Sequence, residues 1–163
     1  GRVEAIKGPH LAIEVARRTG LPLVIAGNVP DEHQVWFETH IAPQLDNTIT
    51  YIGPVDDRQK AQLLGSARAL LMPILWEEPF GIVMAEAMAC GTPVLGFCRG
   101  AVPEVVEHGV SGYLVEDVDG MVNAVDHLGL LNRSDARQRV ERYYSERAIA
   151  DGYLDVYSRI IQH

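Results

Sequence analysis

Short apolar runs alternate with amphipathic helical patterns along most of the chain, and this alternation restricts the fold more than any other feature. Five runs have the continuous apolar, β-rich character of strands that are covered on both faces. They are LPLVIAG (21–27), NTITYIG (47–53), ARALLMP (67–73), TPVLGF (92–97) and SGYLV (111–115). Strands separated by helices are typical of a parallel α/β sheet. The sequence therefore predicts one doubly wound α/β domain of five strands and six or seven helices.

Helix start and stop signals support this prediction. In PHLAIEVARRTG (9–20), Pro9 suits the first helical turn and the final glycine suits a helix end. DDRQKAQLLGSA (56–67) begins with Asp56, a preferred N-cap residue. The chain is helical in pattern from about residue 118, and its last long amphipathic stretch is YYSERAIADGYLDVYSRII (143–161).

The first residues depart from the pattern. GRVEAIKG (1–8) has the character of a loop, yet it runs directly into the first helix. In α/β units a strand normally leads into each helix. We therefore expect the central strand of the sheet to be missing from this chain. A preceding segment of a longer polypeptide, or another chain, would supply it.

Composition argues against several classes of protein. The chain of 163 residues has a net charge of −8, whereas sequence-independent binding of nucleic acid requires a basic face. No apolar run approaches the roughly 20 residues of a membrane-spanning helix, and no signal-like start is present. Cys90 and Cys98 do not form a C-x-x-C pair, so they suit a reducing compartment, and we expect a cytoplasmic location.

The stretch ILWEEPFGIVMAEAMACGTPV (74–94) carries the most informative polar residues. It follows a predicted strand, and open α/β sheets bind ligands at the carboxyl ends of their strands. A helix is expected to begin near Ile82, just after Gly81, and its free N–H groups suit a phosphate. Glu86 lies inside that helix, where it either accepts hydrogen bonds from a pair of sugar hydroxyls or simply complements the helix dipole.

Positive side chains are expected at the same edge of the sheet. Arg2 and Lys7 flank the turn before the first helix, and a diphosphate in a chain of net charge −8 requires such local positive groups. Arginine suits forked contacts with phosphate, and lysine suits a point-charge contact. Arg99, in the glycine-containing turn CRGAVPE (98–104), is a further candidate for a phosphate or acceptor contact.

Four stretches together resemble the C-terminal, donor-binding domain of GT-B glycosyltransferases of the retaining, glycogen-synthase-like group 1 (family 4-like) type. They are GRVEAIKG, PILWEEPFGIVMAEAMACGTPVLGF, GAVPEVVEHGVSGYLV and YYSERAIADGYLDVYSRII. The resemblance covers essentially the whole chain. The spacing of Glu78 and Glu86 within E-P-F-G…E-A-M-A-x-G-x-P-V is highly specific. The resemblance implies a Rossmann-like fold and a hexosyltransferase that moves a sugar from a nucleotide-diphosphate sugar to an acceptor.

The resemblance also implies a role for each motif residue. Glu78 would contact the donor sugar and Glu86 the ribose, while Arg2 and Lys7 would hold the diphosphate and stabilise it as a leaving group. The backbone amides close to the sugar and phosphate would be those of Phe80, Gly81, Ile82 and Val83. The segment near the nucleobase would be Gly53, Pro54 and Val55. Enzymes of this type use neither a bound metal nor another cofactor.

Enzymes of this type have a second, N-terminal domain that holds the acceptor site, and this chain lacks it. The implied partners are the nucleotide-sugar donor, an acceptor of unknown kind (a sugar, a lipid or a small molecule) and that domain. Any peripheral membrane contact would be made through the missing domain, and the fragment alone would be inactive. Residues 145–160 would form a helix that crosses back to the missing domain, so the helix would expose an apolar face here.

Other interpretations stay open. The chain is alternatively a nucleotide-sugar-binding module without transfer activity, or part of a nucleotide-sugar epimerase of the same GT-B shape. Glu78 taken alone is explained by loop solvation, and a double displacement with Glu78 as the nucleophile is a further alternative. His33 and His40 would share a helix face as metal ligands or, more simply, be solvated. Departures from the family pattern at Ala5-Ile6 and Pro73-Ile74 concern the choice of donor, whereas the departure at Arg99-Gly100 concerns the phosphate or acceptor contact of Arg99.

Overall fold

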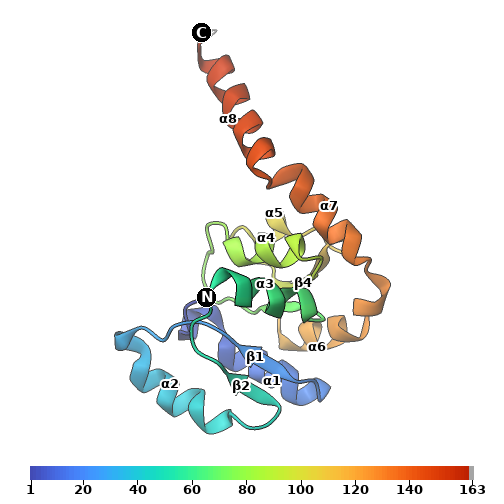
Figure 1. The fold of residues 1–163 in the computed structure, drawn as a ribbon. Coiled ribbons are helices and arrows are strands. Elements are labelled where there is room, and N and C mark those ends of the chain that lie inside the picture. Colours follow the sequence, from blue (N-terminus) through green and yellow to red (C-terminus); the bar gives the residue numbers. More distant parts are fainter. Residues whose placement is uncertain (162–163) are drawn as a thin grey trace.

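The computed structural model describes residues 1–161 and contains five parallel strands (Figure 1). The strands are β1 (Leu23–Ile25), β2 (Ile49–Tyr51), β3 (Leu70–Met72), β4 (Val94–Phe97) and β5 (Gly112–Val115). Each lies inside one of the five predicted runs but is shorter, since the ends of the runs belong to turns and caps. The predicted parallel α/β class is confirmed by the pairing of β1 with β2, of β3 with β4 and of β4 with β5, all parallel.

Eight α-helices connect and cover the strands in the described residues. They are α1 (Pro9–Thr19), α2 (Gln34–His40), α3 (Asp57–Ser66), α4 (Ile82–Ala89), α5 (Val102–Val105), α6 (Val118–Asp126), α7 (Arg133–Tyr143) and α8 (Glu146–Ile161). Short 3-10 helices are η1 (Ala5–Lys7), η2 (Asp31–His33), η3 (Ala42–Gln44) and η4 (Leu128–Leu130). The described residues thus form eight α-helices where the sequence predicts six or seven, and most of the last predicted stretch forms α8 after a break at Tyr144 and Ser145.

The predicted limits of α1 and the predicted start of α3 are confirmed. Pro9 is the first residue of α1, and Gly20 ends that helix in the left-handed conformation. The Asp56 carboxylate accepts a hydrogen bond from the Gln59 backbone N–H, and the Gln59 side chain accepts one from the Asp56 backbone N–H. This reciprocal capping box fixes the start of α3 and the direction of the loop before it.

The strands form two separate sheets, β1-β2 and β3-β4-β5. In the described residues no strand pairs with the edge of β1 that faces away from β2, nor with the outer edge of β3. Residues from β1 and β3 both line a small apolar pocket that also touches α1 and α6. The first residues lie against the segment that directly follows β1, where Gly1 N donates to Ala26 O at 3.1 Å and Val3 N donates to Asn28 O at 2.8 Å.

The largest buried cluster lies around α4. Met84, Ala87 and Met88 on this helix are fully buried, together with Val94 on β4 and Val102 on α5. The apolar residues of α4 thus place one face of the helix in the core, which orients its remaining side chains. Burying three such side chains on an eight-residue helix fixes its position relative to β3 and β4.

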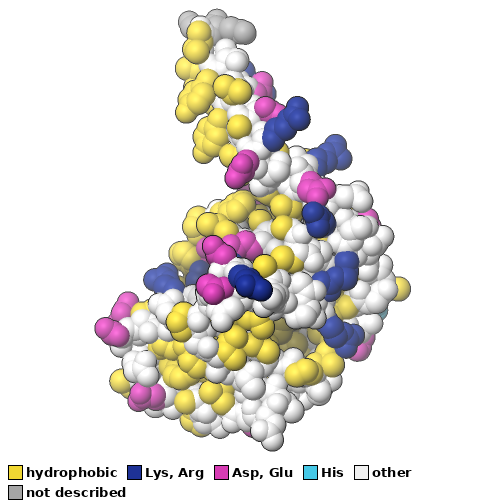
Figure 2. All heavy atoms as spheres, viewed as in Figure 1, with side chains coloured by type: hydrophobic (Ala, Val, Ile, Leu, Met, Phe, Trp, Pro, Cys, Tyr) yellow, Lys and Arg dark blue, Asp and Glu magenta, His cyan; other side chains and the backbone are white. Residues whose placement is uncertain are grey.

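Helix α8 extends away from the body of the molecule (Figure 1) and buries none of its residues. Its apolar side chains form a continuous exposed stripe (Figure 2). They are Ile149, Tyr153, Leu154, Val156, Tyr157, Ile160 and Ile161. The predicted exposed apolar face near residues 145–160 is therefore confirmed, and a stripe of this kind marks an interaction surface. Among the described helices, none is both long enough and apolar enough to cross a bilayer.

The loop of residues 1–8 packs closely against the end of β3. Gly8 has a φ of 69°, and a Cβ atom at this position would lie 2.0 Å from the Pro73 carbonyl oxygen. Two residues away on each segment, Leu75 N donates a hydrogen bond to Ile6 O at 2.8 Å. This close approach requires glycine, because any side chain would separate the two backbones.

We predict that Gly8→Ala destabilises the fold more than Gly20→Ala. Both glycines have a left-handed φ, but nothing lies within 4 Å of a Cβ atom at Gly20. Gly20→Ala should therefore cost about 1 kcal/mol from the backbone alone, and Gly8→Ala a further ~1–3 kcal/mol from overpacking. Urea unfolding of the two variants measures the difference. Equal losses of stability would show that the loop does not pack on Pro73 as described.

Candidate functional site

Three loops meet at the carboxyl edge of β3 and β4. The loop of residues 1–8 contacts the segment after β3, and the turn after β4 closes over it from the other side. Ala101 N donates to Glu78 O at 2.8 Å, and Gly100 N donates to the Glu77 carboxylate at 2.8 Å. A Cβ atom at Gly100 would lie 2.4 Å from Glu78 N. The backbone around Glu78 is therefore held on both sides.

Glu78 forms a buried, hydrogen-bonded ion pair with Lys7. The Glu78 side chain is only 9% exposed, and the Lys7 ammonium group contacts its Oε2 atom. Trp76 Nε1 donates to the same oxygen at 3.1 Å, and Lys7 Nζ lies 4.5 Å from the centre of the Trp76 ring. Solvation in a loop, the simple explanation for Glu78, is wrong. The structure thus identifies Trp76 as a hydrogen-bond donor to Glu78.

Glu86 forms a second ion pair, with a lysine that the sequence analysis did not identify. Lys60 on α3 places its Nζ atom 2.8 Å from Glu86 Oε1 and 3.0 Å from Asp57 Oδ1. The hydrogen bond to Glu86, followed by the one to Asp57, raises the pKa of the Lys60 ammonium group, so it is charged at neutral pH. Lys60 and Lys7 are the only lysines in the chain. This rarity is the one feature of the sequence that could have pointed to Lys60 as a functional residue.

The two ion pairs connect other segments to the stretch that runs from β3 into α4. The Lys7 pair joins the front loop to Glu78, which lies just before α4, and the Lys60 pair joins α3 to Glu86 inside α4. The structure thus connects predicted residues of the front loop and of α4 through this stretch.

Arg2 lies in the same loop and is half exposed. Its guanidinium lies 3.1 Å from Glu4 Oε1, and His33 Nε2 lies 3.1 Å from Glu4 Oε2. Glu4 itself is buried. His33 therefore stabilises the front loop, while His40 stacks on Trp36 instead. Within residues 1–161 no group of three or more His, Cys, Asp or Glu side chains is placed to hold a metal ion.

The start of α4 offers backbone N–H groups at the same edge. Gly81, with a φ of 71°, precedes the helix and provides no side-chain cap, as expected from the sequence. The Ile82 side chain is two-thirds exposed, whereas the side chains of Phe80 and Val83 pack against the core. Of these predicted residues, Ile82 alone presents a largely exposed side chain, and the predicted contacts of the others rely on the backbone.

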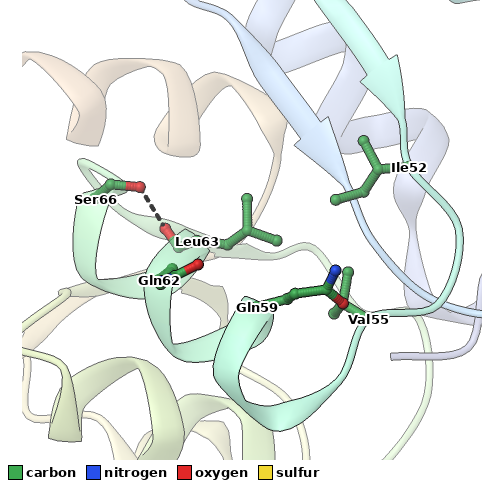
Figure 3. Close-up of a pocket in the computed structure, with 6 residues that line it drawn as sticks. All are labelled: Ile52, Val55, Gln59, Gln62, Leu63 and Ser66. Carbon is green, nitrogen blue, oxygen red and sulfur yellow. Dashed lines mark hydrogen bonds between the residues drawn. The ribbon is translucent and has the colours of Figure 1, made fainter.

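Val55 lines a surface pocket of about 300 Å³ between α3 and the end of β2 (Figure 3). The other lining residues are Ile52, Gln59, Gln62, Leu63 and Ser66. In Figure 3 the side chains of Ile52 and Leu63 point toward one another across this space. Gly53, the other predicted nucleobase residue, has a φ of 75° and accepts a hydrogen bond from Gly27 N at 2.9 Å through its carbonyl oxygen.

Arg99 was the further candidate for a phosphate or acceptor contact. Its guanidinium group donates to the Leu75 carbonyl oxygen at 3.5 Å.

Comparison with known proteins shows consistent similarity. The family model described as "Glycosyl transferases group 1" matches residues 1–147. The D-inositol 3-phosphate glycosyltransferase of Mycobacterium marinum is 33% identical over 136 residues, which are 78% of this chain and 29% of that protein. The chain thus spans less than a third of this curated relative.

Solved structures match across the fold. Anabaena Alr3699/HepE in complex with UDP and glucose aligns with a TM-score of 0.82 at 23% identity, covering 98% of this chain and 47% of that chain. The C-terminal domain of a glycosyl transferase group 1 family protein (LpcC) from Francisella tularensis aligns with a TM-score of 0.76 at 23% identity, covering 90% of this chain and 84% of that domain. At these identities the likeness establishes the fold.

The predicted resemblance is thereby confirmed. The family match extends from the front loop through both motif glutamates and ends in α8. The structural match to an isolated C-terminal domain covers 90% of this chain and shows the same fold. This chain therefore belongs to the group 1 glycosyl transferase family and has the fold of the C-terminal half of GT-B glycosyltransferases.

Proposed function

We propose that this chain is the donor-binding domain of a retaining glycosyltransferase that transfers a hexose from a nucleotide-diphosphate sugar. The observation that carries the proposal is the pair of ion pairs at one edge of the sheet, Lys7–Glu78 and Lys60–Glu86. Both glutamates belong to the family motif, and Lys7 supplies local positive charge of the kind that a diphosphate requires. HepE, of the same fold, was solved with UDP and glucose, which supports a nucleoside diphosphate as the ligand class.

The geometry suits stabilisation of a leaving group. In glycosyl transfer the bond to the diphosphate weakens and the sugar gains oxocarbenium character, so charge builds up on the departing phosphate. Lys7 and Arg2 lie in one loop and would neutralise that charge, which is electrostatic catalysis by preorganised groups. The contact with Glu78 holds the Lys7 ammonium group in a defined position, as electrostatic catalysis requires.

Glu78 is better suited to binding the sugar than to attacking it. Both of its contacts, from Lys7 and from Trp76, use the Oε2 atom. A carboxylate whose electron pairs are engaged by a cation and an N–H donor is a weakened nucleophile, while its other oxygen suits a sugar hydroxyl. We therefore favour a binding role for Glu78 over a double displacement.

We further propose that the complete enzyme adds an N-terminal domain and a central strand. Gly1 and Val3 donate to Ala26 and Asn28 in the segment that directly follows β1, and the two donors and the two acceptors are each two residues apart. This spacing is that of a parallel ladder, so a strand leading into Gly1 would continue it between β1 and β3. The exposed apolar stripe on α8 would pack on the N-terminal domain.

The proposed location of the protein is the cytoplasm. Cys90 and Cys98 are both free thiols, which suits a reducing compartment.

Calorimetric titration of the folded chain with UDP-, GDP- and ADP-sugars tests the donor site. We expect one nucleotide to bind, and Glu86→Ala to weaken it by roughly 10–100-fold, the usual effect of losing a hydrogen bond to a charged group. Glu107→Ala is the matched control, because Glu107 is also paired with a cation, Arg139, but lies between α5 and α7. A folded chain that binds none of the three would contradict the proposal.

Transfer activity is tested after joining the chain to an N-terminal acceptor domain. We expect Lys7→Met to lower kcat about 10²–10³-fold, as loss of one preorganised group that stabilises transition-state charge does. Arg17→Met, which removes an ion-paired cation at the far end of α1, should leave kcat unchanged. Proton NMR of the product should show the anomeric configuration of the donor. Nucleotide binding without turnover in the joined protein would instead favour a non-catalytic binding module.

A further inference from the structure

The two lysines of this chain are divided between the two motif glutamates. Lys7 comes from the loop before α1 and pairs with Glu78, whereas Lys60 comes from α3 and pairs with Glu86. The remaining basic residues are all arginines. Two carboxylates beside a diphosphate would repel it, and pairing each with a cation removes that repulsion. Lys60 therefore bears the same electrostatic relation to Glu86 as Lys7 bears to Glu78.

The position of Lys60 is defined by local structure. It follows directly after the capping box of Asp56 and Gln59, which fixes the first turn of α3. Its ammonium group contacts Asp57 on its own helix and Glu86 on α4. Asp57 is almost fully exposed, while the Glu86 side chain is one-third exposed. The contact that joins two structural elements is thus the one to Glu86.

This contact restricts the orientation of the Glu86 carboxylate. Lys60 contacts the Oε1 atom at 2.8 Å, which limits rotation of the carboxylate group. A glutamate side chain that is free to rotate would lose conformational entropy when it binds two hydroxyl groups. One that is already held would lose less, so its ligand would bind more tightly.

We propose that Lys60 is a positioning residue of the nucleotide site, which holds Glu86 in the orientation that receives the ribose hydroxyls and so favours ribonucleotides over deoxy analogues. This inference rests on the proposed donor-binding function. A different role, in which the ion pair only joins α3 to α4, would change stability but not the discrimination between ribose and dideoxyribose. Exposed ion pairs contribute little to stability, so the two roles are separable.

The test compares UDP, GDP and ADP with their 2′,3′-dideoxy counterparts by calorimetry on the 163-residue chain. For the nucleotide that binds, we expect Lys60→Met to weaken the ribonucleotide about 10-fold while leaving the dideoxy analogue almost unchanged. Lys60→Arg should restore part of the loss, because it keeps the charge. In a Glu86→Gln background, Lys60→Met should have little further effect, since the two residues act together. Urea unfolding of each variant confirms that it is folded.

Asp57→Asn is the matched control, because it removes the exposed contact of Lys60 and keeps the one to Glu86. Its ribonucleotide affinity should equal that of the unmodified chain. Equal weakening of the ribo- and dideoxynucleotides by Lys60→Met would make Lys60 a general charge and overturn the inference. Unchanged binding by Lys60→Met would overturn it too, with the donor site intact. If the folded, unmodified chain binds no nucleotide, the proposed function fails first, and this inference with it.

Discussion

Close contact between backbones at the carboxyl edge of β3 and β4 is the constraint on which the candidate site depends. Gly8 lies against the Pro73 carbonyl, and Gly100 lies against the backbone of Glu78. These glycines allow three loops to approach without side chains between them. The approach brings the Lys7 ammonium group to the Glu78 carboxylate, 71 residues away in the sequence. Without this close approach of the backbones, Lys7 and Glu78 would not be held next to each other.

Charge is distributed unevenly for a chain of this composition. The net charge is −8, yet Arg2, Lys7 and Lys60 each contact a carboxylate. Such pairing offsets the charge of both partners. The partial burial of the Lys7–Glu78 pair strengthens the interaction between these two groups.

Much of the fold is predictable from the sequence, because its signals are local. Each strand lies within an apolar run of the expected length, and Pro9, Gly20 and Asp56 mark the helix ends where the structure has them. The motif residues were also predictable, through the resemblance of E-P-F-G…E-A-M-A to the family. Lys60 was not, since a lysine on a helix is usually solvated and nothing local indicates that Glu86 lies opposite. The roles of Trp76 and His33 were hidden for the same reason.

The sequence by itself determined the order and type of the elements, the parallel α/β class and the identity of the two glutamates. These features depend on hydrophobic periodicity, capping residues and a motif, all of which act over a few residues. Only the tertiary structure decided which cation pairs with which glutamate, how deeply Glu78 is buried and which segment the first residues lie against. Such features depend on where distant segments pack, because an ion pair forms only when the fold brings both side chains within a few ångströms.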